Sequence, residues 1–254
     1  MNGFSPQELS QFQRDGFVIV RGMVGRGLRG RMKEVAMRHL EQEVAPLEFE
    51  AQVSYPGSPA SLDAPGGRTV RRLLQAYARD AAYRAFATSP EAGSRLRQLI
   101  GPHVELSQAH HNCVMTKNPA FSSATGWHQD IRYWSFERPE LVSIWAALGR
   151  EHEENGCLWL VPGSHRVDFR RERFDDDKFF RTDIAENRVL VETRVPAEID
   201  EGDVLFFHCR TLHAAGRNRT DATKFAAVFT YHAAGNRPLT GTRSASLPGV
   251  PLPD

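Results

Sequence analysis

Two residues able to bind a metal ion, His128 and Asp130, are separated by one residue in the segment GWHQD. On an extended strand, residues i and i+2 point to the same face, so both side chains can approach one ion. With a second histidine they would complete a 2-His-1-carboxylate triad, a ligand set that suits iron and leaves coordination positions open. An HxD pattern alone is weak, because a solvated aspartate beside a packed histidine has the same appearance. The pair therefore predicts a metal site only together with a third ligand.

A third ligand is available in the segment EGDVLFFHCRTLH, residues 201–213. A Gly-Asp turn leads into an apolar strand, and two histidines follow. His208 lies within the strand, where packing or a hydrogen bond would explain it. His213 lies beyond the strand beside the small residues Ala214 and Ala215, which leave room for a ligand. The residues alone leave both histidines open, with His213 favoured.

The positions of these motifs depend on the elements around them. Ser5, Pro6 and Glu8 indicate a helix start, and Asp15-Gly16 indicates a turn before the strand FVIV. Apolar periodicity and turn residues predict helices over 28–44, 71–87 and 90–100, and strands over 103–107, 109–116, 141–148, 157–161, 188–195, 203–208 and 225–232.

Many short strands separated by turns predict a mainly β fold with flanking α-helices, of the jelly-roll type. We expect a single domain over 1–254, in which a helical and loop-containing part, 1–102, packs on a β core, 103–235, before a tail, 236–254. The irregular segments 55–67 and 170–183 are expected to act as lids over the mouth of the core.

The composition limits the possible partners. Lys and Arg number 32 and Asp and Glu number 31, so the formal charge of +1 favours neither nucleic acid nor an anionic membrane. Three cysteines without CxxC spacing argue against a disulfide framework and agree with a reducing cytoplasm. The longest apolar stretch is too short to span a bilayer. We expect a cytoplasmic monomer or homodimer that acts on a small molecule.

The sequence resembles the phytanoyl-CoA dioxygenase family, including its bacterial natural-product branch. The matching segments are DGFVIVRG, WHQDIRYW, ENGCLWLVPGSHR, EGDVLFFHCRTLHAAGRNRT and YHAAGNRPL, in the order that the family shows. The resemblance implies a double-stranded β-helix of the cupin-like type. It also implies that His128, Asp130 and His213 bind Fe(II), with 2-oxoglutarate as cosubstrate and O2 as oxidant. The choice of His213 over His208 rests on this resemblance.

The resemblance also implies residues for the cosubstrate. Relatives hold its distal carboxylate with an arginine where this chain has Lys224, which supplies charge without the planar two-pronged pairing of arginine. Trp145 is expected to line the cosubstrate pocket, and His111 and Cys113 match positions that contact 2-oxoglutarate. Alternatively, Lys224 is a solvated strand-edge residue and the cosubstrate is bound by an arginine, the candidates being Arg71, Arg72, Arg217 and Arg219.

The implied activity is oxidation of a C–H bond, with release of succinate and CO2, in natural-product biosynthesis. Hydroxylation is the expected outcome, and cyclisation, desaturation or epoxidation would use the same ligands. Halogenation is disfavoured because related halogenases lack the carboxylate ligand that Asp130 provides. Two other classes remain as alternatives: a zinc hydrolase, although no HExxH is present, and a non-catalytic metal-binding jelly roll, which Lys224 makes more credible. The sequence does not identify the substrate.

Overall fold

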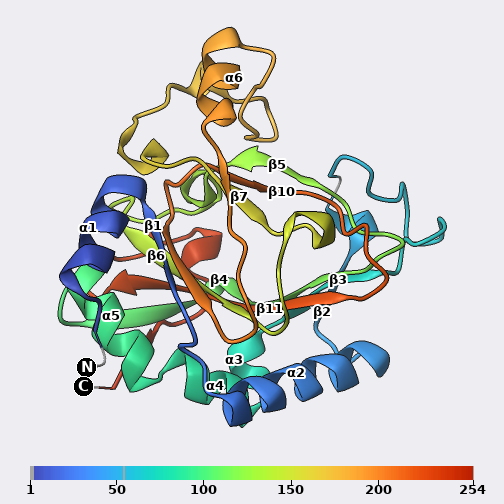
Figure 1. Cartoon of the computed structure of the whole chain (residues 1–254), viewed down its shortest axis with the longest axis horizontal. Helices are drawn as coiled ribbons and strands as arrows, with labels where there is room; N and C mark the ends of the chain where they lie inside the picture. The colour runs from blue at the N-terminus through green and yellow to red at the C-terminus, as the bar shows by residue number, and fades with distance from the viewer. Residues whose placement is uncertain (1–2, 54, 254) are drawn as a thin grey trace.

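The computed structural model describes residues 3–53 and 55–253, and within them two antiparallel sheets face each other (Figure 1). The larger, eight-stranded sheet has the order β1-β9-β6-β11-β4-β3-β2, with β12 paired to β4, and the smaller, four-stranded sheet has the order β5-β10-β7-β8. The two sheets and the helices beside them confirm the predicted jelly roll.

The larger sheet consists of β1 (Phe17–Val20), β2 (Leu47–Phe49), β3 (Val70–Leu74), β4 (Val104–Lys117), β6 (Leu141–Ala147), β9 (Val204–His208), β11 (Lys224–Ala233) and β12 (Val250–Pro251). The smaller sheet consists of β5 (Thr125–His128), β7 (Leu158–Leu160), β8 (Val195–Pro196) and β10 (His213–Ala215). The helices are α1 (Pro6–Asp15), α2 (Arg26–Glu41), α3 (Ala76–Arg79), α4 (Ala81–Ala87), α5 (Pro90–Ile100) and α6 (Ala185–Glu192). None of these helices in the described part of the chain is long and apolar enough to cross a bilayer.

Each face of the larger sheet has its own core, because successive side chains of a strand point to opposite faces. Phe206 belongs to the cluster that also contains helical residues such as Met32 and Leu96, whereas its neighbour Phe207 packs with Leu160 of the smaller sheet. Helices α2, α4 and α5 therefore cover the outer face, on the side away from β5 and β10 (Figure 1). The inner face is left for the second sheet and the cavity between the sheets.

Helix α1 begins and ends where the sequence predicts. The Ser5 hydroxyl accepts from the Glu8 amide at 3.3 Å, and the Glu8 carboxylate accepts from the Ser5 amide at 2.7 Å, which forms a capping box. Gly16 ends the helix with φ of 83°, a left-handed conformation that glycine adopts without a steric penalty. This turn leads into β1, which pairs with β9 and forms one edge of the larger sheet.

Two predicted elements are wrong. The first four residues of the predicted helix 71–87 belong instead to strand β3, because Val70–Leu74 pairs with both β2 and β4, and only the rest is helical, in α3 and α4. The predicted strand 188–195 is largely helix α6, in which Val189 is 65% exposed and Asn187 is buried. In both segments the packing partners outweigh the local pattern of apolar residues.

The predicted strands 103–107 and 109–116 form one long strand, β4, with an irregular register between Phe229 and Thr230 of its neighbour β11. The predicted helix 28–44 is present as α2, and the predicted strands 141–148, 203–208 and 225–232 correspond to β6, β9 and β11. The central sheet that carries the candidate residues was therefore predictable from its apolar runs.

Asp203, of the Gly-Asp turn, links two strands at the edge of the larger sheet. Its carboxylate accepts hydrogen bonds from the amides of Gly22 and Asp200 at 2.7 and 2.9 Å and pairs with Arg21 at 2.6 Å. Burial opposes ionisation of this group, but the Gly22 amide, Arg21 and the Asp200 amide outweigh burial and lower the pKa of Asp203. The carboxylate thus ties the end of β1 to the start of β9.

We expect Asp203→Asn to destabilise the protein near neutral pH and to have a much smaller effect in acid. A carboxylate with a lowered pKa stabilises the fold above its unfolded pKa of about 4, and this contribution is lost as the pH falls through the folded pKa. Urea unfolding of wild type and variant at about pH 7 and about pH 3 measures the difference. An equal difference in the free energy of unfolding between wild type and variant at both pH values would contradict a role for the charge of Asp203.

Candidate metal centre and cosubstrate pocket

The structure brings the three predicted metal ligands together at strands β5 and β10 of the smaller sheet and the short helix after β5. His128 ends β5, Asp130 begins the short helix η2 (Asp130–Tyr133), and His213 begins β10, where it is paired in register with His128. Asp130 Oδ1 lies 3.6 Å from His128 Nε2 and 3.7 Å from His213 Nε2. One ligand atom from each residue lies within 4.8 Å of the other two, and such a group can hold a metal ion.

The donor atoms of the triad fit a single divalent cation. His128 Nδ1 donates to the Gly126 carbonyl at 2.8 Å and His213 Nδ1 donates to the Thr211 carbonyl at 2.9 Å, since a carbonyl can only accept. Each imidazole is thereby oriented with Nε2 free to bind a metal. The other carboxylate oxygen of Asp130, Oδ2, is buried and has no hydrogen-bond partner among the described residues, as expected where an ion is to be bound.

The protonation states also favour metal binding. Burial, followed by the charge of His128, lowers the pKa of His213 to about 4, so this imidazole is neutral near pH 7. Burial opposes ionisation of Asp130, but His111, His213 and His128 outweigh burial and hold the pKa of Asp130 below its usual range. A neutral imidazole and an ionised carboxylate are the forms that bind a divalent ion.

His208, the alternative third ligand, lies elsewhere. Its Nδ1 accepts from the Arg210 amide at 3.1 Å, and its ring lies 5.5 Å from that of His165. The potential metal-binding group found among the described residues contains His213 and does not contain His208.

A cavity between the two sheets extends from the triad into the core, and we call it the inner cavity. Trp145 and His111, two of the predicted cosubstrate residues, line it, whereas Lys224 and Cys113 do not. Cys113 lies among the lining residues of a different pocket, and burial raises the pKa of its thiol to about 11. The inner cavity is lined by Tyr55, Arg71, Arg72, His111, Met115, Lys117, Thr125, His128, Trp145, Leu158, Phe207, His213, Ala214 and Ala215.

Lys224 is buried beside the inner cavity and is paired with an acid. Its Nζ lies 2.6 Å from Glu151 Oε2, and the indole N–H of Trp145 donates to Glu151 Oε1 at 2.7 Å. The ammonium also lies 5.1 Å from the centroid of the Trp145 ring. Lys224 is therefore no solvated strand-edge residue, and Glu151 already balances its charge.

Lys117 is a second buried lysine, and no motif in the sequence indicates it as a binding residue. It is the cross-strand partner of Lys224, lines the inner cavity, and donates to the carbonyls of Ser123 and Gly216. No carboxylate of the described chain lies within ion-pair distance of its ammonium. Burial, and then the charge of Lys224, lower the pKa of Lys117 well below its usual value.

The buried guanidinium of Arg71 is held by several partners. It donates to the Ser123 hydroxyl at 2.7 Å and to the Thr125 hydroxyl at 2.9 Å, and it lies 3.5 Å from the buried carboxylate of Glu50. Arg71 thus has a structural role between β3 and β5, although part of its surface also lines the inner cavity.

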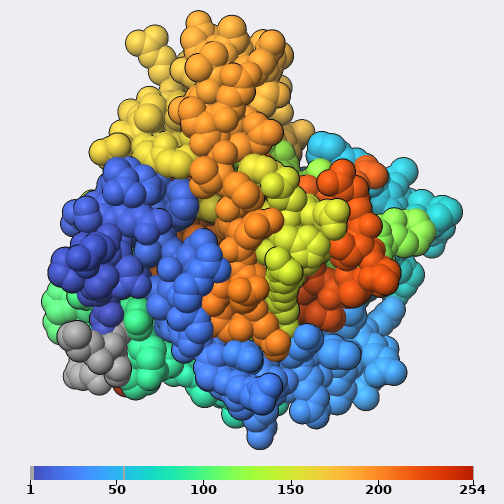
Figure 2. All heavy atoms as spheres, in the orientation of Figure 1, coloured from blue at the N-terminus to red at the C-terminus, as the bar shows by residue number. Residues whose placement is uncertain are grey.

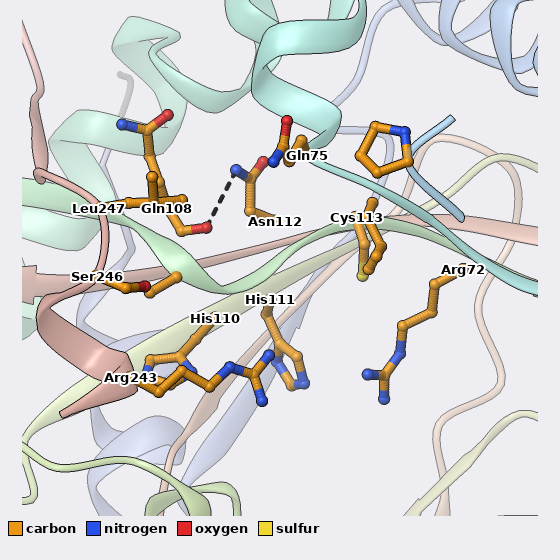
Figure 3. A pocket seen from close by; sticks show the side chains of 13 residues that line it. Arg72, Gln75, Gln108, His110, His111, Asn112, Cys113, Arg243, Ser246 and Leu247 are labelled. Carbon is orange, nitrogen blue, oxygen red and sulfur yellow. Dashed lines mark hydrogen bonds between the residues drawn. The ribbon is translucent and has the colours of Figure 1, made fainter. Parts of the chain in front are cut away.

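A second cavity adjoins the triad, and we call it the outer pocket; Figure 3 shows the part of it that Arg72, Gln108 and Arg243 line. Two adjoining sets of lining residues make it up, and they share Arg72, His110, His111 and Arg243. One set includes His128 and Asp130, so the outer pocket begins at the metal ligands. The other reaches Gln75, Gln108 and Leu247, away from the triad.

The two segments expected to act as lids meet close to the triad. Tyr55 and Phe179 form an edge-to-face contact with centroids 5.5 Å apart, and Phe179 lies 6.2 Å from the ring of His128. A Cβ atom at Gly126 would lie 2.9 Å from the Phe179 ring, so the absent side chain allows this close approach. The segment leading to α6 protrudes at this end of the molecule (Figures 1 and 2).

A jelly roll that presents two histidines and an aspartate around one point defines the class of non-haem iron oxygenases. The family model of phytanoyl-CoA dioxygenase matches residues 12–226, and the chain belongs to this family. It is 25% identical over 226 residues to the peroxisomal phytanoyl-CoA dioxygenase of Homo sapiens, with 85% of this chain and 64% of the human protein covered. The chain thus spans less than two thirds of that relative.

Solved structures share the fold. The carbocyclase SnoK of nogalamycin biosynthesis, described as non-haem and α-ketoglutarate-dependent, matches with a TM-score of 0.75 and 22% identity over 99% of this chain and 94% of its own. EctD from S. alaskensis, with 2-oxoglutarate and 5-hydroxyectoine, matches with a TM-score of 0.78 and 19% identity over 93% of this chain and 78% of its own. These two likenesses show the common fold.

Proposed function

We propose that this protein hydroxylates a C–H bond of a small-molecule substrate, with iron bound by His128, Asp130 and His213 and with 2-oxoglutarate as cosubstrate. The observation that carries the proposal is the triad itself, in which the Nε2 atoms of both histidines lie 3.6 and 3.7 Å from Asp130 Oδ1. When bound, iron and 2-oxoglutarate supply oxidation by O2, coupled to decarboxylation of the cosubstrate to succinate and CO2. The intact carboxylate of Asp130 argues against halogenation.

The inner cavity is our candidate for the cosubstrate site. It begins at His128 and His213, so a molecule within it can reach an ion on the triad, and Trp145 and His111 form part of its wall. Cys113 lies outside this lining, and for it we propose a packing role beside Met115, whose sulfur lies 3.7 Å away.

Charge balance indicates which group binds the distal carboxylate of the cosubstrate. Glu151 neutralises Lys224, and Glu50 lies beside Arg71, but Lys117 faces the inner cavity without an acidic partner among the described residues. An incoming carboxylate would favour the charged form of this lysine, which burial otherwise disfavours. We therefore propose Lys117 as the direct partner, with Lys224 as a second charge behind it.

We expect the anaerobic protein with Fe(II) and 2-oxoglutarate to show the weak visible charge-transfer absorption of a chelated cosubstrate, because the triad leaves positions open for chelation. On admission of air, succinate should form slowly even without substrate. Absorption spectroscopy and chromatography of succinate measure the two results. Tight zinc binding with neither signal would contradict the oxygenase and favour the alternative metal-binding classes.

Cyclisation remains a second candidate outcome, because SnoK, a carbocyclase, matches nearly the whole chain. The mass of the product distinguishes the two outcomes once a substrate is found. Hydroxylation adds one oxygen atom, whereas oxidative ring closure removes two hydrogen atoms.

A further inference from the structure

The wall of the outer pocket carries two guanidinium groups, and they differ in their partners. Arg72 and Arg243 both line it, and Figure 3 shows their guanidinium groups on either side of His111. The only carboxylate among its lining residues is the metal ligand Asp130. Glu48 lies 3.3 Å from Arg72 and pairs with that arginine, whereas no carboxylate of the described residues lies within ion-pair distance of Arg243.

Arg243 is exposed but held in a fixed turn. Its side chain has no hydrogen bond or ion pair within the described chain, whereas the next residue, Ser244, is buried and anchors the turn η6 (Arg243–Ala245). The Ser244 hydroxyl accepts from the Ser135 amide at 2.8 Å and lies 2.7 Å from His110 Nε2. The contacts of Ser244 thus hold the backbone at the pocket wall and leave the Arg243 guanidinium available to an anion.

His110, which lies beside Arg243 in the wall of the pocket, does not supply a competing charge. Burial, and then the charge of Arg243, lower the pKa of His110 to about 3, so His110 is neutral at physiological pH. His110 therefore adds no positive charge to those of Arg72 and Arg243.

Aromatic rings form another part of the wall. Tyr55, Tyr133 and Trp134 line the pocket near the metal ligands. Trp134 stacks on His110 with centroids 5.0 Å apart and an angle of 24°, which holds the indole in place. A flat apolar body fits such walls, because aromatic side chains offer large surfaces at a low cost in conformational entropy.

We propose that the substrate is a small organic carboxylate with a planar ring, whose carboxylate binds Arg243 while the ring lies against the aromatic wall near the iron. This inference rests on the proposed function and names the substrate class for it. A guanidinium pairs with a carboxylate through two parallel hydrogen bonds. One guanidinium without a carboxylate partner among the described residues matches the single charge of a carboxylate better than a phosphate monoester, which carries nearly two charges.

The test is a binding experiment with matched probes. Benzoate, cinnamate and 2-naphthoate are compared with their amides and with phenyl phosphate by calorimetry and ligand-observed NMR, on anaerobic protein loaded with Fe(II) and 2-oxoglutarate. We expect the carboxylates to bind in preference to the amides and the phosphate, with the cosubstrate retained. Arg243→Gln should weaken carboxylate binding by about tenfold or more, the effect of losing a charge-assisted hydrogen bond.

Two variants control the interpretation. Arg243→Lys should keep part of the affinity, and Arg237→Gln, at an exposed arginine of the same segment that does not line the pocket, should keep all of it. Equal binding of acids and amides, preference for the phosphate, no carboxylate binding at millimolar concentration, or an unchanged affinity in Arg243→Gln would each overturn the substrate class. Retention of Fe(II) and 2-oxoglutarate, measured on the same sample, tests the proposed function separately.

Discussion

His213→Ala is expected to lower the affinity for Fe(II) by more than about 100-fold, since loss of even an outer-shell partner of a metal ligand costs 10–100-fold. The variant removes one of three protein ligands, while the Nδ1 contact to the Thr211 carbonyl that orients this ring is lost with it. Iron content after anaerobic desalting, together with titration of the charge-transfer absorption, measures the effect.

His208→Ala is the matched control for this variant, because His208 is also a largely buried histidine near the end of an apolar strand. Its neighbours are the Arg210 amide and His165, and it is no part of the metal-binding group. We expect iron retention like that of wild type. Loss of iron from His208→Ala with retention in His213→Ala would reverse the ligand assignment.

Lys117→Met is expected to raise the dissociation constant of 2-oxoglutarate by about 30-fold or more, because one partner of a buried charge pair is removed. Binding of Fe(II) should change little, because Lys117 is not one of the metal ligands. Within the described residues its ammonium donates hydrogen bonds to the carbonyls of Ser123 and Gly216. Calorimetry with an inert divalent metal in place of iron measures cosubstrate affinity without turnover.

A comparison with variants at Lys224 tests which of the two lysines binds the distal carboxylate of 2-oxoglutarate directly. Lys224→Met alone would leave Glu151 buried without its partner, so the double variant Lys224→Met/Glu151→Gln is the fairer control. We expect the double variant to lose less affinity for 2-oxoglutarate than Lys117→Met. A larger loss in the double variant would instead support Lys224 as the direct partner, as the resemblance to the family implies.

The metal centre was predictable because two local patterns indicated its ligands and the family resemblance decided between His208 and His213. The spacing of His128 and Asp130 places both on one side of an extended segment, and His213 follows an apolar strand whose end is visible in the sequence. The alternation of apolar residues likewise predicted β6, β9 and β11. In these segments the local pattern and the final packing agree, as expected for a sequence that folds to one structure.

The cosubstrate end of the cavity was not predictable in the same way. Lys117 acquires its significance from its register with Lys224 across two strands, and Glu151 reaches Lys224 from a loop between β6 and β7. Such pairings join residues distant in sequence and leave no periodic signal. The segment starting at Arg71 was misassigned as helix for a related reason, because its apolar spacing is ambiguous until β2 and β4 pair with it.

The iron ligands lie on or beside paired strands, whereas two of the aromatic residues near them, Tyr55 and Phe179, come from loops. Substitutions in these loops can change what enters the site without disturbing the hydrogen bonds that hold the ligands. Selection can therefore act on substrate choice and on metal binding almost independently. Such a division offers a physical reason why a carbocyclase and EctD share this architecture with the present chain at only 22% and 19% identity.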